Sequence, residues 1–578
     1  MLNKKRVIGA MVLATAVLMS ACGGGSSSSV YGELTENDKL IEAKVKDHQY
    51  PYAEPGTKLK IGKTHDACVP DFETNAFSLY LEEKTGLELD FEVYADSNSV
   101  KTMLAANSDD LPDIAVSPSL SDADFIQYGV GDYGTGAVVP WDYYYENYGY
   151  YYKQAVEQTI IDKIDNFLIA ADGHRYTVPY ICEQMGNVFS GKAFINKVWL
   201  DKLGLEVPTT TEELRTVLEA FRDKDPNGNG QKDEIPMTGS TNGYTAKPYE
   251  FLLNAFVYCD RDNYMWADDK GKVSYIYTSD DYKEGLKYIS DLCKDGLLDK
   301  QSLIQKNEEL KAISCAETNR IGVLIGGSPD NVFSAKLERM LDYVPLPVPK
   351  GPKGINYPYM KPIKPTNMGW MSRKCEHPLA GYALFDFMMS EEATTFARYG
   401  IEGKRDPSGK NDPEIVKDWY RATTDEEKDR ALFKHIGFEG DIVTILGYGT
   451  ITNSHWQAQN PQYRSSKIAD GMVWDGNPLN GEYVKAQAIT PYYLEEADRK
   501  EIEKHIVRAL KFENLEDQKN YSTLASSLKT YFQQQQAKFI VGDLDVEKDW
   551  DKFQTELKNL KIDQCLELAQ KGYDYMER

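Results

Sequence analysis

The chain has 578 residues, of which 41% are hydrophobic and 12% aromatic, so it is long enough for two or more domains with large cores. Its 90 acidic side chains outnumber the 66 basic ones and leave a net charge of −24. This charge argues against a nucleic-acid partner, because phosphates need a basic surface, and against adsorption to anionic lipid.

The N-terminus has the pattern of an export signal. Lys4, Lys5 and Arg6 precede an apolar run over residues 7–19, which is too short to span a membrane comfortably. We therefore expect residues 1–21 to be a signal peptide that is removed on export.

Cys22 follows the small residues Ser20 and Ala21, and this pattern resembles the bacterial lipobox, although Met19 stands where leucine is usual. In a lipobox the new N-terminal cysteine carries lipid, such as palmitate. The resemblance implies a protein anchored by lipid to the extracellular face of the cell membrane, with residues 22–56 as a flexible tether. The alternative is an ordinary secretory signal in which the cysteine is coincidental.

Strand and helix patterns alternate after this tether. Strands are predicted at 59–61, 87–93 and 111–116, with helices at 75–85 and 100–106 between them. Such alternation predicts βαβ units and a mostly parallel sheet.

Residues 139–153 are rich in aromatic side chains, with Trp141, Tyr143 and six further tyrosines. Two interpretations stay open at this point. The rings can pack a helix onto a core, or they can act as flat platforms that line a cleft.

A helix is predicted to begin at Thr210, which forms a capping box with Glu213, and it leads directly into an acidic loop at 225–234. The loop reads Asp-Pro-Asn-Gly-Asn-Gly-Gln-Lys-Asp-Glu. It sets oxygen-bearing side chains in a glycine-rich turn, as a hard cation with roughly six to eight oxygen ligands requires. The spacing predicts a Ca²⁺ site, although its last carboxylates come too early for an EF-hand. An acidic surface turn is the alternative, because Asp, Asn and Gly are also turn residues.

The later part of the chain adds a strand at 321–325, a crossing segment at 345–365, a helix from Pro378 and a largely helical stretch at 495–578. No phosphate loop, dinucleotide fingerprint, nucleophile elbow or zinc-type histidine spacing is present, and the seven cysteines beyond Cys22 form no CxxC pair. These absences favour a protein that is not an enzyme, while a catalytic pair among the 90 carboxylates stays open.

Several blocks resemble extracellular solute-binding protein family 1, the lipoproteins that feed ABC sugar importers, and in particular its large oligosaccharide-binding branch. The most specific block covers 194–236, from Phe-Ile-Asn-Lys-Val-Trp to Asp-Glu-Ile-Pro. Supporting blocks are Leu-Pro-Asp-Ile at 111–114, the helix from His377, and the C-terminal helices from Lys538. The resemblance spans roughly residues 57–578.

This resemblance implies an α/β protein with the type II periplasmic-binding-protein fold, in which two α/β lobes enclose a ligand cleft and move about a hinge. The first lobe is expected to comprise residues 57–185 and about 342–373. The second is expected to comprise 186–341 and about 374–578.

The resemblance also gives the acidic loop a role. In related alginate-type binders such a loop holds one structural Ca²⁺. The ligands carried over to this chain are Asp225, Asn227, Asn229, the carbonyl of Gln231, Asp233 and Glu234.

Sugar-contacting residues do not follow from a shared motif. We predict them among aromatics that lie outside the obvious core helices, because aromatic faces stack on sugar rings. The candidates are Trp141, Tyr143, Trp370, Trp456 and Trp474. Each of these rings has packing in a core as its alternative.

The resulting hypothesis is a monomeric, non-enzymatic subunit that binds an oligosaccharide in the cleft and delivers it to the permease of an ABC importer. A ligand that is a peptide or another polar solute is one alternative. A surface glycan-processing enzyme, which needs paired carboxylates roughly 5–10 Å apart, is another. A surface adhesin is the third.

Overall fold

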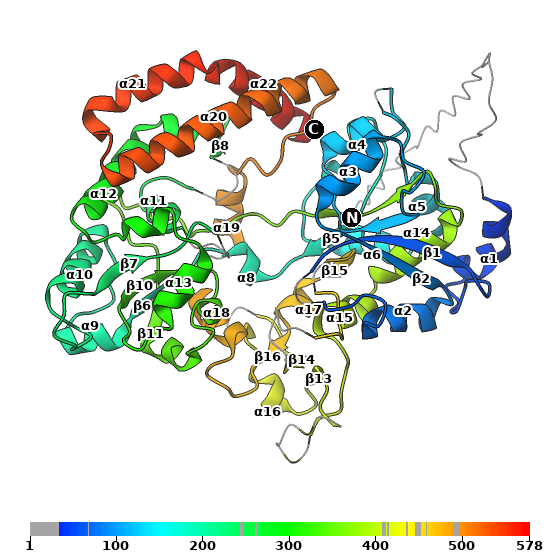
Figure 1. The fold of residues 1–578 in the computed structure, drawn as a ribbon, viewed down its shortest axis with the longest axis horizontal. Helices are drawn as coiled ribbons and strands as arrows, with labels where there is room; N and C mark the ends of the chain where they lie inside the picture. Colours follow the sequence, from blue (N-terminus) through cyan, green and yellow to red (C-terminus); the bar gives the residue numbers. More distant parts are fainter. Residues whose placement is uncertain are drawn as a thin grey trace, which may run out of the picture.

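The computed structural model describes residues 34–577, apart from short segments at 67–68, 133, 243–246, 260–263, 407, 409–411, 413–414, 435–436, 446–451, 458 and 490–495. The expected signal peptide and Cys22 therefore lie outside the described residues. Within those residues, no helix has both the length and the apolar character needed to cross a membrane. Figure 1 shows two lobes side by side, joined by several crossing segments.

The first lobe is built on a seven-stranded sheet with the order β15-β5-β12-β3-β1-β2, in which β4 also pairs with β12. The predicted βαβ alternation is confirmed, because β1 pairs in parallel with both β2 and β3. β12 runs antiparallel to its neighbours, and β15 runs parallel to β5. The strands are β1 (Lys58–Thr64), β2 (Glu88–Tyr94), β3 (Ile114–Val116), β4 (Val138–Val139), β5 (Val178–Cys182), β12 (Thr366–Ser372) and β15 (Gln462–Arg464).

Helices cover both faces of this sheet (Figure 1). They are α1 (Glu36–Lys46), α2 (Ala76–Thr85), α3 (Ser97–Ala105), α4 (Asp122–Tyr128), α5 (Asp142–Tyr148), α6 (Tyr151–Gln158), α7 (Asp165–Leu168), α14 (Pro378–Met388) and α15 (Glu391–Tyr399).

The second lobe contains a four-stranded sheet with the order β11-β6-β10-β7, formed by β6 (Ala193–Asn196), β7 (Ile235–Thr238), β10 (Ile321–Ile325) and β11 (Tyr343–Leu346). The capping box predicted at Thr210 and Glu213 is present at the start of α10 (Thr211–Asp223). The other helices of the second lobe are α9 (Lys197–Leu203), α11 (Pro248–Leu253), α12 (Asp280–Lys294), α13 (Asn307–Ser314), α18 (Gly481–Ile489), α19 (Glu496–Glu503), α20 (Leu515–Val541), α21 (Val546–Asn559) and α22 (Ile562–Glu577). The helical C-terminus is thus as predicted, and α20 packs on α12.

Two small sheets complete the fold. The hairpin of β8 (Met265–Ala267) and β9 (Val273–Tyr275) belongs to the second lobe. A three-stranded sheet of β13 (Trp419–Arg421), β14 (Ile442–Thr444) and β16 (Met472–Val473) lies below the space between the lobes in Figure 1. It is accompanied by α16 (Asp425–Lys428) and α17 (Ser466–Asp470).

The structure corrects the expected lobe boundaries. Residues 374–578 do not all belong to the second lobe, because α14, with every residue buried, packs in the core of the first lobe together with part of α15. β15 also extends the first sheet, whereas β11, expected in the first lobe, pairs with β6 in the second.

The expected flexible tether at 22–56 also needs correction. Its C-terminal part forms α1, whose Ile41 and Val45 are buried in the core of the first lobe. An amphipathic helix with such a partner is held by apolar burial rather than left as a linker.

The aromatic segment packs onto the core. Tyr144, Tyr148 and Tyr152 are buried with α14 in the first lobe. The carboxylate of Asp386 on α14 accepts the backbone N–H groups of Tyr150, Tyr151 and Tyr152 at 3.0–3.1 Å. Complete burial raises the pKa of Asp386 to about 6, and these three amides oppose the shift. The packing interpretation therefore holds for these tyrosines.

Candidate functional site

A cavity with a volume of about 1180 Å³ lies between the lobes. It opens where β5 and β15 end, since Met185, which follows β5, and Ser466, which follows β15, both line it. The two strands are parallel neighbours, so their carboxyl ends meet at one edge of the sheet. This edge is the usual position of ligands in α/β proteins.

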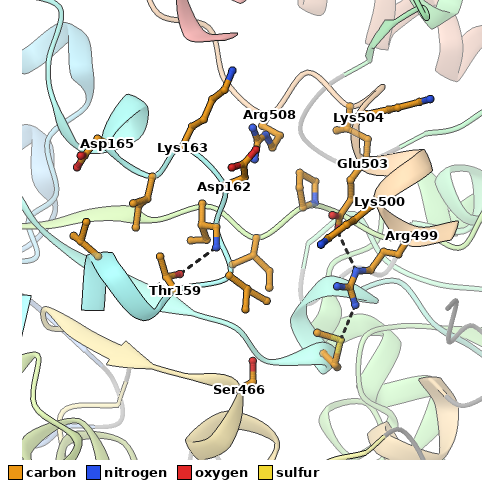
Figure 2. Close-up of a pocket in the computed structure, with 18 of the residues that line it drawn as sticks. Thr159, Asp162, Lys163, Asp165, Ser466, Arg499, Lys500, Glu503, Lys504 and Arg508 are labelled. Atoms are coloured by element: carbon orange, nitrogen blue, oxygen red, sulfur yellow. Dashed lines mark hydrogen bonds and ion pairs between the residues drawn. The ribbon is translucent and has the colours of Figure 1, made fainter. Parts of the chain in front are cut away.

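Each lobe supplies one wall of this cleft (Figure 2). Residues 159–165 of the first lobe form one wall, and residues from Arg499 to Arg508 in and after α19 form the other. Pro362 and Ile363, from the segment that links β11 to β12, also line it. A site made by both lobes can close around a ligand by hinge motion.

The cleft walls combine aliphatic surface with charged groups of both signs. Arg499 is typical, because its guanidinium lies 3.4 Å from the carboxylate of Glu503 and 3.8 Å from the sulfur of Met185. Figure 2 shows this arrangement. The basic residues that line the cleft are Lys163, Arg499, Lys500, Lys504 and Arg508, and the acidic ones are Asp162, Asp165, Glu503 and Glu577. The lining is therefore close to neutral, unlike the whole chain, and offers many hydrogen-bonding groups to a polar ligand.

The two lobes touch at one side of the cleft, where the end of α22 meets α7 and the loop before it. The Lys163 ammonium donates to the carbonyl of Glu577, and the Asn166 side chain donates to the carbonyl of Met576 at 2.5 Å. Within the second lobe, Arg508 forms an ion pair with the side chain of the same Glu577 at 3.7 Å. The contacts of Lys163 and Asn166 between the lobes are exposed or half-buried, so they can break as the lobes move.

None of the five aromatic residues predicted to bind ligand lines this cleft. Trp141, Trp370 and Trp456 are at most 1% exposed and lie inside the hydrophobic cores, which corrects the prediction for these three. The indole of Trp370 donates to the carbonyl of Pro118 at 2.8 Å, so its polar edge is satisfied within the protein. The physical reason is that burial of a large aromatic side chain strongly stabilises the folded state. The local sequence around such a residue does not show whether the fold buries it.

Tyr143 and Trp474 are only half-buried. Tyr143 packs at the edge of the first core. Trp474 stacks on Tyr483, with ring centroids 4.3 Å apart, and donates to the carbonyl of Asn477. A ligand contact by these two residues stays a prediction.

Sequence reasoning missed the residues that do line the cleft. Ile160, Ile363 and Arg499 belong to no motif, and they come from three distant parts of the chain. Ile160 is 52% exposed, although it follows an aromatic segment that packs in the core. No local pattern in the sequence marks these residues, because the exposure of a side chain depends on which segments pack against it.

The acidic loop lies apart from this cleft, between α10 and β7 at the edge of the second sheet. The carboxylate of Asp225 accepts three backbone N–H groups, from Gly228, Asn229 and Gly230, at 2.9–3.1 Å. Gly228 and Gly230 have φ values of 76° and 73°, which only glycine adopts without strain. The loop is therefore wound around its own first carboxylate.

The oxygen-bearing side chains of this loop are suitable ligands for a cation. Among the described residues no group donates to Oε1 of Glu234, although this atom is buried. Burial raises the pKa of Glu234, and the carboxylates of Asp225 and Asp233 raise it further. The side-chain amides of Asn227 and Asn229 both donate to one oxygen of Asp233 at 3.0 Å. Rotation of either amide by 180° would present oxygen instead, so the ring of groups suits an ion with oxygen ligands.

Comparisons with known proteins agree with this geometry. A family model described as bacterial extracellular solute-binding protein matches residues 69–395. The fructooligosaccharide ABC transporter substrate-binding protein FusA of Streptococcus pneumoniae is 25% identical over 98% of this chain and 97% of its own length.

Two solved structures show the same fold. An EF-hand mutant of S. pneumoniae FusA in complex with fructo-nystose superposes with a TM-score of 0.71 at 23% identity, over 90% of this chain and 99% of that one. An HMO-binding, ABC-transporter-associated solute-binding protein from Bifidobacterium longum infantis gives 0.68 at 20% identity, with the same coverage. The expected two-lobed α/β architecture is thereby confirmed.

Proposed function

Because the chain belongs to the bacterial extracellular solute-binding protein family, we propose that it binds an oligosaccharide in the interlobe cleft and delivers it to the permease of an ABC importer. The observation that carries this proposal is the cavity of about 1180 Å³ formed by both lobes at the carboxyl ends of β5 and β15. Similarity to FusA over nearly the whole chain supports a carbohydrate as the ligand.

The proposed role needs binding and release but no covalent chemistry. The lobes supply hydrogen-bonding groups on both walls, so a polar ligand gains its full set of contacts only when the cleft closes. A monomer is sufficient for this mechanism.

Titration calorimetry against a panel of oligosaccharides tests the proposal. We expect saturable binding of at least one oligosaccharide without turnover, and Arg499→Ala is expected to weaken it about tenfold or more, because a hydrogen bond from a charged group contributes roughly 1.5–3 kcal/mol. Arg222→Ala is the matched control, since Arg222 lies on α10 in an ion pair with Asp223, outside the cleft. Hydrolysis of a glycan would instead identify an enzyme, and a fully silent panel would contradict a carbohydrate ligand.

We further propose that Cys22 carries the lipid that anchors the protein to the outer face of the cell membrane. The support is the charged, apolar and small-residue order of residues 1–22. Cys22→Ala is expected to move the protein from the membrane fraction to the medium, as measured by fractionation and immunoblotting. If the variant stays with the membrane, the anchor lies elsewhere.

We also propose that the loop at 225–234 binds one structural Ca²⁺. Asp225, Asn227, Asn229, Asp233 and Glu234 would hold the ion through side-chain oxygens, with the Gln231 carbonyl as a sixth ligand. The buried, unpaired oxygen of Glu234 supports this assignment among the described residues. The existence of an EF-hand mutant of FusA is consistent with a cation site in that relative. The ion would hold the link between α10 and β7 and take no part in the cleft.

A further inference from the structure

A second group of metal-ligating side chains lies on the second lobe, away from the loop at 225–234. Asp269, Glu501 and His505 each offer one ligand atom, and these atoms lie within 4.8 Å of one another. Asp269 stands in the turn between β8 and β9, whereas Glu501 and His505 come from α19 and the residues that follow it. Since Glu501 and His505 are four residues apart on a helical turn, they face the same side.

The backbone holds the two segments together. The Ala267 N–H donates to the carbonyl of His505 at 2.8 Å, and Trp266 and Ile506 form a β-bridge. The imidazole of His505 stacks on the indole of Trp266, with centroids 4.7 Å apart and ring planes 17° apart. The position of the imidazole relative to the β8–β9 turn is therefore set before any ion binds.

Hydrogen bonding also selects the tautomer of His505. Its Nδ1 lies 2.8 Å from the carbonyl oxygen of Ala267. A carbonyl oxygen can only accept, so Nδ1 carries a proton and donates it. Nε2 is left facing the carboxylate of Asp269 at 3.7 Å. Metal-binding histidines are oriented in this way, with one ring nitrogen on a carbonyl and the other on the ion.

A cation already lies against these carboxylates. The ammonium of Lys504 pairs with Glu501 and lies 3.8 Å from Asp269. Lys504 is a flexible side chain that also lines the interlobe cleft, so it can leave this position without disturbing the backbone. The two carboxylates thus attract positive charge at the place where a metal ion would be ligated.

We propose that Asp269, Glu501 and His505 form a binding site for a divalent transition-metal ion of the Zn²⁺ type, which displaces the ammonium of Lys504. One imidazole and two carboxylates suit zinc better than calcium, because calcium takes oxygen ligands only. Three protein ligands leave one tetrahedral position for water. The ion would tie α19, which lines the cleft, to the β8–β9 turn.

Calorimetric titration of the calcium-saturated, full-length protein with ZnCl₂ tests this site. We expect one saturable Zn²⁺ site in the wild type, and His505→Ala is expected to weaken it by more than about tenfold, at least as much as the loss of an outer-shell partner does. Lys504→Met is expected to bind Zn²⁺ more tightly, because it removes the competing ammonium. The visible spectrum of bound Co²⁺ should report a nitrogen ligand that is lost in His505→Ala.

His174→Ala is the matched control. His174 also faces a carboxylate, that of Asp142 at 2.8 Å, and it is not part of the metal-ligating group found among the described residues. Its zinc isotherm should equal that of the wild type. Melting curves in zinc-free buffer show that each variant is folded. The assignment is overturned if His505→Ala gives the same zinc isotherm as the wild type. It is also overturned if Lys504→Met binds Zn²⁺ no more tightly than the wild type.

Discussion

Removal of calcium is expected to lower the melting temperature of the second lobe by roughly 5–10 °C. At a free Ca²⁺ concentration about a hundredfold above Kd, an ion bound only by the folded state contributes about 2.7 kcal/mol. For a lobe of this size each kcal/mol shifts the melting temperature by about 2–4 °C. The shift arises because Asp225, Asp233 and Glu234 are left facing one another without a counter-charge. Scanning calorimetry with and without a calcium-selective chelator measures it.

Two variants separate the ion from general effects of the chelator. Asp233→Ala removes a proposed ligand, so its melting temperature should be low in both buffers. Asp223→Asn changes a nearby exposed carboxylate that pairs with Arg222, and it should keep the full response to chelation. Oligosaccharide affinity should stay unchanged, because no residue of the loop lines the cleft. Loss of ligand binding at an unchanged melting temperature would contradict a structural role for the ion.

Trp456→Ala is expected to destabilise the first lobe by about 3–5 kcal/mol. Trp456 is fully buried, and its ring makes edge-to-face contacts with Phe72, Phe77 and Phe91 at centroid distances of 5.2–5.9 Å. Its indole N–H donates to Oγ of Ser78 at 3.0 Å. Truncation leaves a cavity and an unpaired hydroxyl, and chemical denaturation followed by circular dichroism measures the loss.

A buried cation beside Trp456 makes a second contribution to the stability that the ring provides. The buried ammonium of Lys63 lies 4.7 Å from the Trp456 ring centroid and donates to the carbonyl of Gln459 at 2.5 Å. Burial lowers the pKa of Lys63 to about 7, and the nearby carboxylate of Asp66 opposes this shift. The face of the Trp456 ring also stabilises the charged ammonium, and truncation to alanine removes this interaction.

Trp474→Ala is the comparison, because Trp474 is half-buried and stacks on a single tyrosine. This variant should lose about 0.5–1.5 kcal/mol of stability from the aromatic pair, in addition to the smaller loss from its buried area. Trp456→Phe, which keeps an aromatic ring, serves if Trp456→Ala does not fold. A stable Trp456→Phe variant with lost oligosaccharide affinity would restore the ligand-binding role predicted for this residue.

Local features were predictable where the pattern carries its own physical cause. The capping box of Thr210 and Glu213 needs only residues three apart, and the structure has it at the start of α10. The β1–β2 pairing, from Lys58 with Glu88 to Thr64 with Tyr94, follows from adjacent strands joined by one helix. The shape of the loop at 225–234 likewise follows from its own glycines and oxygens.

The lobe boundaries were less predictable. α14 is apolar apart from Asp386, so its sequence indicates that it is buried but not which lobe buries it. Besides the neighbouring β12 and α15, it packs on α1, α5 and α6, more than two hundred positions earlier. Tyr152 of α6, for example, donates its backbone N–H to Asp386. The local sequence of such a helix does not predict which elements it packs against.

The sequence by itself determined the alternation of strands and helices, the acidic loop and the family, while the export signal and lipid anchor at Cys22 stay predictions. Only the tertiary structure decided which aromatic residues are buried and which side chains face the cleft. Trp456, which is buried, and Ile160, which is exposed, are examples. Burial depends on contacts between segments far apart in the chain, whereas caps, turns and ligand-bearing loops depend on neighbours within a few residues.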